Sequence, residues 1–289
     1  MPPPLLAVDG PFLLYRSFFA LPDSIKGTDG RPVNALLGAV NVLLRVAADH
    51  TPRAIVVCFG AEAAEYRVAL YPPYHADRPP VPDALQWQFD QAPELLDAFG
   101  WSTQTTSQLE ADDLLGALAS VESVASGRAL ILTGDRDMYQ CVSDQVSVMY
   151  LKQGTSGFEE VDAAEVNRRY GVEPALVPDF IALRGDPSDG LPGAPGVGPK
   201  KAAELLLKHH SLDQAIAHAH EESPRVRSAL IDNAADLAHF KEIATLRPIE
   251  VPRPPDRATD LEHGAQAARR YGMNRLAERL EKAEKITDL

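Results

Sequence analysis

Residues 129–137 read ALILTGDRD, an apolar run that stops at a glycine and two aspartates. Two similar runs, Leu5–Val8 (LLAV) and Ala54–Phe59 (AIVVCF), come earlier, and the less regular Val146–Leu151 (VSVMYL) follows. Continuous apolar runs of this length are typical of strands buried on both faces of a parallel sheet. Helical patterns separate them at residues 35–48, 85–99 and 109–124. This alternation predicts an α/β fold with a mostly parallel central sheet flanked by helices.

The pattern becomes helical after residue 158. Helices are expected at residues 161–170, 178–183, 199–209, 212–219, 234–246 and 265–283. We therefore expect an α/β core over residues 1–160 and a helical region over residues 161–289, packed together as one compact unit. The stretch LYPPYHADRPPVPD (70–83) contains five prolines, so it should be an excursion from the sheet.

Composition limits the classes of protein to consider. The chain has 289 residues, 28 basic and 41 acidic, which gives a net charge of −13. That balance argues against nucleic-acid binding through a general basic surface, unless many acids are gathered at a metal site. The two cysteines, Cys58 and Cys141, do not suggest a disulfide framework. No apolar stretch approaches the roughly 18 to 20 residues needed to span a bilayer, so we expect a cytoplasmic protein with no membrane partner.

The acidic residues fall at strand ends, at one helix start and before a glycine-rich hairpin. Those that meet this description are Asp9, Glu110, Asp112, Asp113, Asp135, Asp137, Asp186 and Asp189. The carboxyl ends of parallel strands meet at one edge of a sheet, where ligands bind. The sequence therefore predicts that these acids come together.

Helix capping is the alternative explanation for any one of these acids. It does not account for three acids within Glu110–Asp113, or for aspartates at two separate strand ends. Clustered carboxylates repel one another unless cations neutralise them, and oxygen ligands suit Mg²⁺ or Mn²⁺. Metal-assisted phosphoryl transfer, with two ions about 4 Å apart, is the chemistry this pattern favours.

The stretch LPGAPGVGPKK (191–201) follows the last two acids directly. Its glycines allow positive φ angles and close approach of the backbone, and Pro199 suits the first position of a helix. Backbone amides at that helix start, with Lys200 and Lys201, could face a phosphate. A plain helix–turn–helix corner with surface lysines is the alternative, but the adjoining acid pair favours a grip on a nucleic-acid backbone.

The motifs YHADRPPVPD (74–83), EADDLLG (110–116), TGDRDMYQ (133–140) and GDPSDGLPGAPGVGPKKAAELL (185–206), in this order after Asp9, resemble the 5′-nuclease (flap endonuclease) superfamily. The chain looks most similar to the bacterial branch, found as the N-terminal domain of DNA polymerase I and as stand-alone 5′–3′ exonucleases. The resemblance extends from residue 5 to about residue 280, and the order of the motifs makes it specific.

The resemblance implies a PIN-like core, a helical arch over about residues 70–105 and a helix–hairpin–helix over about residues 178–210. It implies that the eight acids hold two or three Mg²⁺ or Mn²⁺ ions, and that K⁺ binds at the hairpin. The implied catalytic residues are Arg78, at the scissile phosphate, His75, in place of an arch lysine, and Tyr74, stacked on a base. The implied DNA contacts are Arg67, Gly193, Gly196, Gly198, Lys200 and Lys201. Each of three residues has an alternative explanation. Tyr74 could pack within the arch, and His75 could be exposed and have no role. Arg67 could form a surface ion pair.

The implied activity is metal-dependent, structure-specific hydrolysis of DNA at 5′ ends and 5′-flap junctions, leaving 5′-phosphates, in replication and repair. A monomer that works beside a separate DNA polymerase is expected.

One position departs from the family pattern. The strand Ala54–Phe59 is followed by Gly60, where the family usually carries an aspartate of the metal set. We therefore expect one ion to be bound more weakly and to need more Mg²⁺ or Mn²⁺. A DNA-junction-binding protein with weakened or lost cleavage is one alternative, and a metal-dependent ribonuclease is another. The eight retained acids favour an active enzyme, and the hairpin favours duplex DNA.

Overall fold

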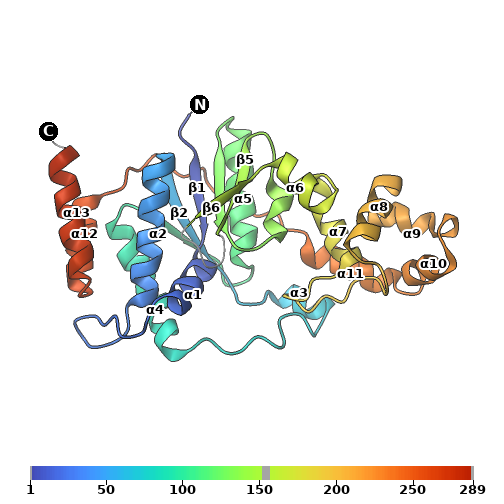
Figure 1. The fold of residues 1–289 in the computed structure, drawn as a ribbon, viewed down its shortest axis with the longest axis horizontal. Helices are drawn as coiled ribbons and strands as arrows, with labels where there is room; N and C mark the ends of the chain where they lie inside the picture. The colour runs from blue at the N-terminus through green and yellow to red at the C-terminus, as the bar shows by residue number, and fades with distance from the viewer. Residues whose placement is uncertain (1, 152–156, 288–289) are drawn as a thin grey trace.

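The computed structural model describes residues 2–151 and 157–287, with side chains up to residue 283. Six strands form one sheet in the order β3–β2–β1–β4–β5–β6 (Figure 1). Their bounds are β1 Leu5–Asp9, β2 Ala54–Phe59, β3 Ser102–Thr105, β4 Ala129–Thr133, β5 Val146–Leu151 and β6 Phe158–Val161. β1 to β5 are parallel, and β6 pairs antiparallel with β5. The expected α/β fold with a mostly parallel sheet is confirmed.

Helices from the first part of the chain cover both faces of the sheet. They are α1 Gly10–Ala20, α2 Asn34–His50, α3 Glu65–Leu70, α4 Asp83–Ala98 and α5 Ala111–Val124. Because successive strand residues point to opposite faces, Leu5 and Ala7 of β1 belong to the core that contains α5. Leu6 and Val8 belong to the core that contains α1, α2 and α4. Burial on both faces explains the continuous apolar strands.

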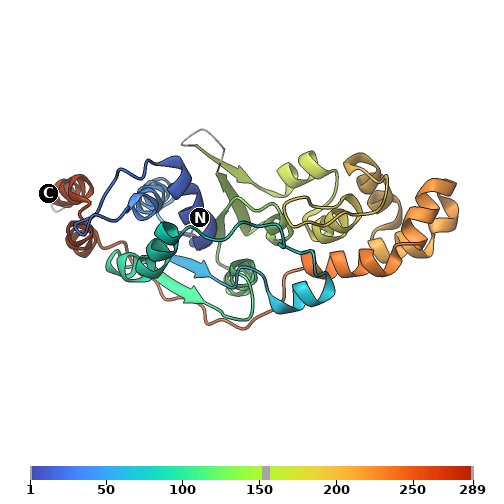
Figure 2. The same ribbon diagram turned by 90° about the horizontal axis from the view of Figure 1, so that it is seen from below.

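The rest of the described chain is helical. Its α-helices are α6 Ala163–Tyr170, α7 Val177–Arg184, α8 Pro199–His209, α9 Leu212–Ala217, α10 Pro224–Ile231, α11 Ala234–Ala244, α12 Leu261–Arg270 and α13 Asn274–Thr287. Short 3-10 helices are η1 Asp137–Cys141, η2 Pro174–Leu176 and η3 Ala219–Glu221. Figures 1 and 2 show an elongated molecule, with α12 and α13 at one end and α8 to α10 at the other. None of the described helices is long and apolar enough to cross a membrane.

The arch range of residues 70–105 contains three different parts in this structure. Residues 71–82 form turns and extended chain, followed by α4 and then β3. Leu85 and Leu95 of α4 are fully buried, and β3 pairs with β2, so both elements belong to the core. Residues 71–82 connect α3 to α4 and pass below the sheet in Figure 1, across the carboxyl ends of its strands, with Tyr74 still packed in the core. The apolar face of α4 explains why that helix packs instead of arching over the site.

The C-terminal helix expected over residues 265–283 is two helices. The chain turns at Gly272, whose φ is +75°, between α12 and α13. A Cβ at this position would lie 2.8 Å from the backbone nitrogen of Thr28, so close packing also favours glycine. The amphipathic pattern continues through the turn, which is why the sequence alone predicts one helix.

Glu122 of α5 fastens the extended segment after α11 to the core. Its side chain is 1% exposed and accepts hydrogen bonds from Arg53, with Nε–Oε1 at 3.0 Å, and from Arg253, with Nη2–Oε1 at 2.8 Å. These two guanidinium groups lower the pKa of Glu122 although burial opposes them.

Glu122→Gln is expected to lower the free energy of unfolding at pH 7, because two partly buried guanidinium groups lose their carboxylate. A lowered folded-state pKa contributes stability that is present above the unfolded pKa of about 4.3 and is lost as pH falls. The difference between wild type and variant should therefore shrink in acid. Urea unfolding from pH 7 to pH 3 measures it. Asp97→Asn, which removes an exposed partner of Arg257, is the control and should show a much smaller difference.

Candidate active site

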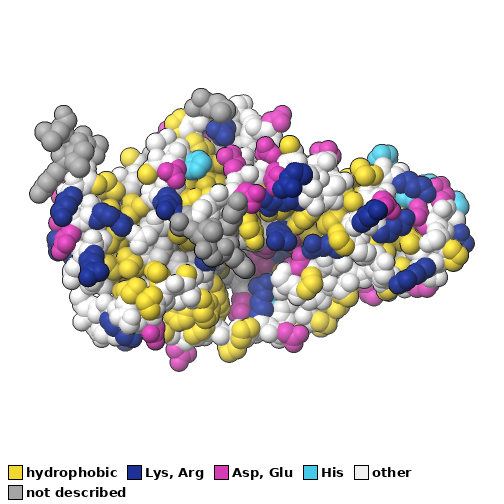
Figure 3. All heavy atoms as spheres, in the orientation of Figure 1, with side chains coloured by type: hydrophobic (Ala, Val, Ile, Leu, Met, Phe, Trp, Pro, Cys, Tyr) yellow, Lys and Arg dark blue, Asp and Glu magenta, His cyan; other side chains and the backbone are white. Residues whose placement is uncertain are grey.

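An acid-lined cavity of 820 Å³ opens at the carboxyl edge of the sheet. Six of the eight predicted acids line it: Asp9, Glu110, Asp112, Asp135, Asp186 and Asp189. Arg78 lines it as well, from the segment of residues 71–82. Figure 3 shows this face hollowed between the sheet and helices α7 to α11, where acidic and basic side chains both gather. The fold therefore brings together acids that lie up to 180 positions apart in the sequence.

Thr133 joins the ends of the two central strands at this cavity. Its hydroxyl donates to Asp9 Oδ2 at 2.7 Å and accepts from the backbone N–H of Asp135 at 3.0 Å. Asp9 also accepts from the N–H of Phe12 at 3.0 Å, so it caps α1. Asp135 in turn accepts from the N–H of Asp137 at 2.8 Å. Capping and site formation are therefore combined in one side chain at Asp9.

Burial and mutual repulsion raise the pKa of four of these acids. Burial is the larger cause for Asp9, Asp112, Asp135 and Asp137, and the neighbouring carboxylates add to it for the last three. The pKa of Asp135 rises to about 7. Asp112 lines the cavity, and no described residue donates a hydrogen bond to its carboxylate. Such an all-oxygen, charge-crowded set fits hard divalent cations.

The acids nevertheless do not form a closed ligand group. Among the side chains that the structure describes, in residues 2–151 and 157–283, no three from His, Cys, Asp or Glu are already arranged to hold a metal ion. They surround the cavity, and all of the lining acids except Asp112 accept hydrogen bonds from the protein instead. Binding of an ion would therefore need water ligands or small side-chain movements.

Asp113 caps α5 and does not line the cavity. It accepts from the N–H of Glu110 at 3.2 Å and from the N–H of Arg247 at 2.7 Å, and it is fully buried. Asp137 is also absent from the cavity lining and lies behind Asp135. For Asp113 the structure thus matches the capping alternative.

Arg67 is 3% exposed and lies against Glu110, with Nη1–Oε2 at 2.6 Å. A second pair joins its Nη2 to Asp113 Oδ1 at 3.4 Å. The predicted contact of Arg67 with DNA is thus replaced in this structure by a buried ion pair. Tyr74 is also buried, and its hydroxyl donates to Glu110 Oε2 at 3.0 Å. Its ring stacks on His75 at 3.8 Å and does not line the cavity, so it is not placed to stack on a base.

His75 and Arg78 both contact Asp189. The imidazole Nε2 of His75 lies 3.0 Å from Asp189 Oδ1, and its Nδ1 lies 2.9 Å from the carbonyl oxygen of Glu62. Arg78 donates to the same Oδ1 at 3.2 Å, and its side chain is 42% exposed. His75 is therefore held in place and is not the solvent-exposed residue of the alternative reading, whereas Arg78 can reach a ligand in the cavity.

The hairpin before α8 has the backbone that its sequence predicts. Gly193 and Gly196 have φ angles of +69° and +77°, and Gly198 is the N-cap of α8. Lys201 is tied to Glu222, with Nζ–Oε2 at 3.1 Å. Lys200 is exposed, and none of the described acids pairs with it.

The sequence analysis missed an aromatic wall of the cavity. Phe12, Tyr15, Phe59 and Phe89 line it beside the acids. Tyr15 meets Phe89 edge to face at 5.8 Å between ring centroids. Phe12 and Tyr15 lie one helical turn apart directly after Asp9, and this spacing could have indicated them.

Gly60 lies at the cavity, where the backbone of α5 leaves no room for a side chain. A Cβ at this position would be 2.4 Å from the backbone nitrogen of Ala111 and 2.4 Å from the carbonyl carbon of Glu110. The neighbouring N–H of Ala61 donates to the carbonyl of Leu109 at 2.9 Å. The packing at the start of α5 therefore leaves no room for an aspartate at residue 60.

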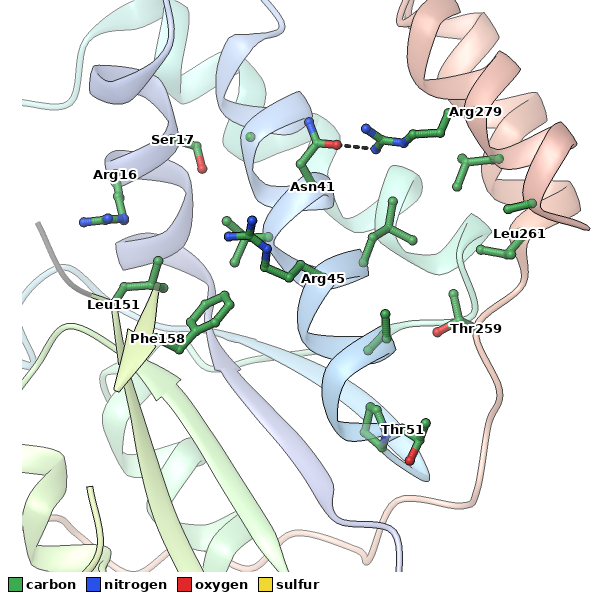
Figure 4. Close-up of a pocket in the computed structure, with 18 of the residues that line it drawn as sticks. Arg16, Ser17, Asn41, Arg45, Thr51, Leu151, Phe158, Thr259, Leu261 and Arg279 are labelled. Atoms are coloured by element: carbon green, nitrogen blue, oxygen red, sulfur yellow. Dashed lines mark hydrogen bonds between the residues drawn. The ribbon is translucent and has the colours of Figure 1, made fainter. Parts of the chain in front are cut away.

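A larger groove of 1030 Å³ runs over α2 and reaches α13 (Figure 4). Its charged lining residues are Arg16, Arg45 and Arg279, and none of the described residues that line it is Asp or Glu. Hard divalent cations bind to oxygen ligands, above all carboxylates. The acid-lined cavity is therefore the candidate active site, although it is smaller than this groove.

Comparison with known proteins shows the family of the chain. Residues 4–171 match the 5′-3′ exonuclease N-terminal resolvase-like domain, and residues 172–263 match the 5′-3′ exonuclease C-terminal SAM fold. A 5′-3′ exonuclease of Mycobacterium tuberculosis is 38% identical over 97% of this chain and 97% of its own length. One of Streptomyces coelicolor is 36% identical over 91% of this chain and 92% of its own length. DNA polymerase I of Mycobacterium tuberculosis is 37% identical over 88% of this chain, which spans 28% of that relative.

Solved structures show the same fold. The T5 D15 protein co-crystallized with metal ions has a TM-score of 0.70 at 16% identity, covering 96% of this chain and 97% of its own. The catalytic core of Rad2 in complex with DNA substrate has a TM-score of 0.65 at 13% identity, covering 96% and 90%. With both halves of the sequence matched and a relative similar over nearly its whole length, the chain belongs to the 5′–3′ exonuclease family.

Proposed function

We propose that this chain is a divalent-metal-dependent, structure-specific 5′ nuclease that hydrolyses DNA at 5′ ends and 5′-flap junctions, leaving 5′-phosphates. The cavity in which six acids meet at the carboxyl edge of the sheet carries this proposal. The curated relatives that match nearly the whole chain are named 5′-3′ exonucleases. Structures with the same fold are described with metal ions or with DNA.

The residues that would hold divalent ions are Asp9, Glu110, Asp112, Asp135, Asp186 and Asp189. When bound, such ions supply a hydroxide nucleophile and stabilise charge on the phosphate. We propose Mg²⁺ or Mn²⁺, because every donor is an oxygen. Asp137 supports the ligand Asp135 from behind through its backbone N–H. Thr133 fixes the orientation of Asp9.

The segment of residues 71–82 supplies the polar groups that face the acids. Arg78 is exposed at the cavity and is proposed to contact the scissile phosphate, where a guanidinium can donate two parallel hydrogen bonds. His75 and Tyr74 are proposed as positioning residues, since they contact Asp189 and Glu110. The aromatic wall beside the acids offers apolar surface to the bases of the strand being cut.

The hairpin is proposed to hold the duplex strand through the backbone at Gly193, Gly196 and Gly198 and through Lys200. Lys201 is proposed to join them after leaving Glu222. The K⁺ ion at the hairpin, the monomeric state and a separate DNA polymerase as partner stay predictions from the family resemblance.

A labelled 5′-flap duplex and a nicked duplex, each incubated with and without Mg²⁺ or Mn²⁺, test this function. Metal-dependent release of a 5′-phosphorylated product from at least one substrate is expected. Tight binding without cleavage of either substrate would instead favour the junction-binding alternative, and cleavage of RNA alone would favour a ribonuclease. Neither result would be compatible with the proposed function.

A further inference from the structure

Arg225, at the start of α10, lies against the hairpin although it comes about 30 residues later in the chain. A Cβ placed on Gly196 would be 2.7 Å from Nη2 of Arg225 and 3.0 Å from its Nε. The guanidinium therefore covers the hairpin backbone at the glycine with a φ of +77°. This contact places a cation at the turn of the helix–hairpin–helix, although Arg225 lies outside the residue range of that motif.

Arg225 is exposed, and within the described part of the chain it makes no ion pair or hydrogen bond. Lys200 is likewise exposed and unpaired among the described residues, but several other cations of this region are occupied. Arg227, two residues further along α10, donates to the carbonyl oxygen of His220 at 2.6 Å. Lys201 and Lys208 both bind Glu222, with Nζ–Oε distances of 3.1 and 2.8 Å.

An unpaired guanidinium at this place indicates a binding role, because acids outnumber bases in the chain. The chain has 41 acids for 28 basic residues, and its buried arginines, such as Arg53 and Arg67, are paired with carboxylates. Figure 3 shows Lys and Arg side chains over the end of the molecule that α8 to α10 form. A guanidinium is suited to phosphate because its planar fork can donate two hydrogen bonds to two oxygens.

We propose that Arg225 binds a phosphate of the duplex strand held at the hairpin, so that the DNA-binding surface extends from the hairpin onto α10. The inference rests on the proposed function and names a further contact for the same substrate. Because Gly196 has no side chain, the guanidinium lies directly against the hairpin backbone. Both can then contact neighbouring phosphates of one DNA strand. Arg225 is a binding residue in this proposal and takes no part in the chemical step.

The test measures DNA affinity by fluorescence anisotropy without divalent ions, using a nicked duplex and a single strand of equal length. Arg225→Ala is expected to weaken duplex binding about tenfold, a loss typical of a hydrogen bond to a charged group. The slope of log affinity against log salt should fall by about 1, as for one lost phosphate contact. Arg225→Lys should bind with intermediate affinity, because it keeps the charge but loses the fork.

Arg227→Ala is the matched control, since it removes the same charge from the same helix but from a residue whose guanidinium is held by the carbonyl oxygen of His220. It should leave the salt slope close to that of wild type, and melting curves check that both variants fold. Equal affinities and slopes for Arg225→Ala and Arg227→Ala would overturn the proposal, as would an equal loss of binding to the single strand. Failure of the proposed function would show separately, as wild-type protein that binds the duplex but never cuts it.

Discussion

Replacing Asp9 by asparagine should reduce metal-dependent cleavage of a 5′-flap duplex by about a hundredfold to a thousandfold, the range for loss of one preorganised electrostatic group. Asparagine caps helices as well as aspartate does, so the hydrogen bond to the N–H of Phe12 can persist and α1 should stay intact. The variant loses the negative charge at the end of β1, and its amide nitrogen takes the place of the oxygen that accepts from the Thr133 hydroxyl. Single-turnover rates over a range of Mg²⁺ and Mn²⁺ concentrations, together with urea unfolding, separate lost chemistry from lost stability.

Asp162→Asn is the matched control for this prediction. Asp162 caps α6 by accepting from the N–H of Glu165 at 2.8 Å, and it does not line the cavity. The same chemical change there should leave the cleavage rate and its metal dependence unaltered. If Asp9→Asn cleaved as fast as Asp162→Asn at low metal concentration, Asp9 would not be a metal ligand.

Gly60→Asp should destabilise the protein by about 1–3 kcal/mol, the cost expected when a side chain is forced against closely packed atoms. The family resemblance suggests that an aspartate here would strengthen metal binding. The structure argues otherwise, because the first atom of the side chain would already meet the backbone of Glu110 and Ala111 at 2.4 Å. Moving that backbone would also move Asp112, so cleavage should fall together with stability. Urea unfolding and a Mn²⁺ titration of cleavage measure both effects.

Gly198→Ala is the comparison, since a Cβ at that glycine meets no atom within 4 Å. Its effect on the free energy of unfolding should stay within about 1 kcal/mol, the usual cost of alanine at an N-cap. A Gly60→Asp protein as stable as wild type, with cleavage at lower Mn²⁺ concentration, would contradict the packing argument. Position 60 would then be an open ligand position, as the family pattern suggests.

Much of the fold follows from local patterns. The strands at Ala54–Phe59, Ala129–Thr133 and Val146–Leu151 and the helix at Pro199–His209 have the predicted bounds. They could be predicted because their apolar runs or end signals are strong. The polar strand β3 (STQT) and the short antiparallel β6 lack such a signal, and their pairing with β2 and β5 defines them.

The sequence predicts where the site lies, but not which side chains line it. The strand-end rule locates Asp9 and Asp135, but it cannot say which side of α5 faces the cavity. Asp112 and Asp113 are adjacent, so their side chains point about 100° apart on the helix, and only the first lines the cavity. The pairing of Arg67 with Glu110 joins residues 43 positions apart through the packing of α3, which no local pattern encodes.

The contacts of residues 64–78 with the acids give the enzyme a built-in competition. The carboxylate of Glu110 contacts Arg67 and Tyr74, and the carboxylate of Asp189 contacts His75 and Arg78. An incoming cation would need the same carboxylate oxygens. By thermodynamic reciprocity, whatever draws this stretch of chain away from the acids strengthens cation binding, and cation binding loosens the stretch by the same factor. In the proposed enzyme, binding of the divalent ion and release of residues 64–78 from the acids are then one coupled equilibrium.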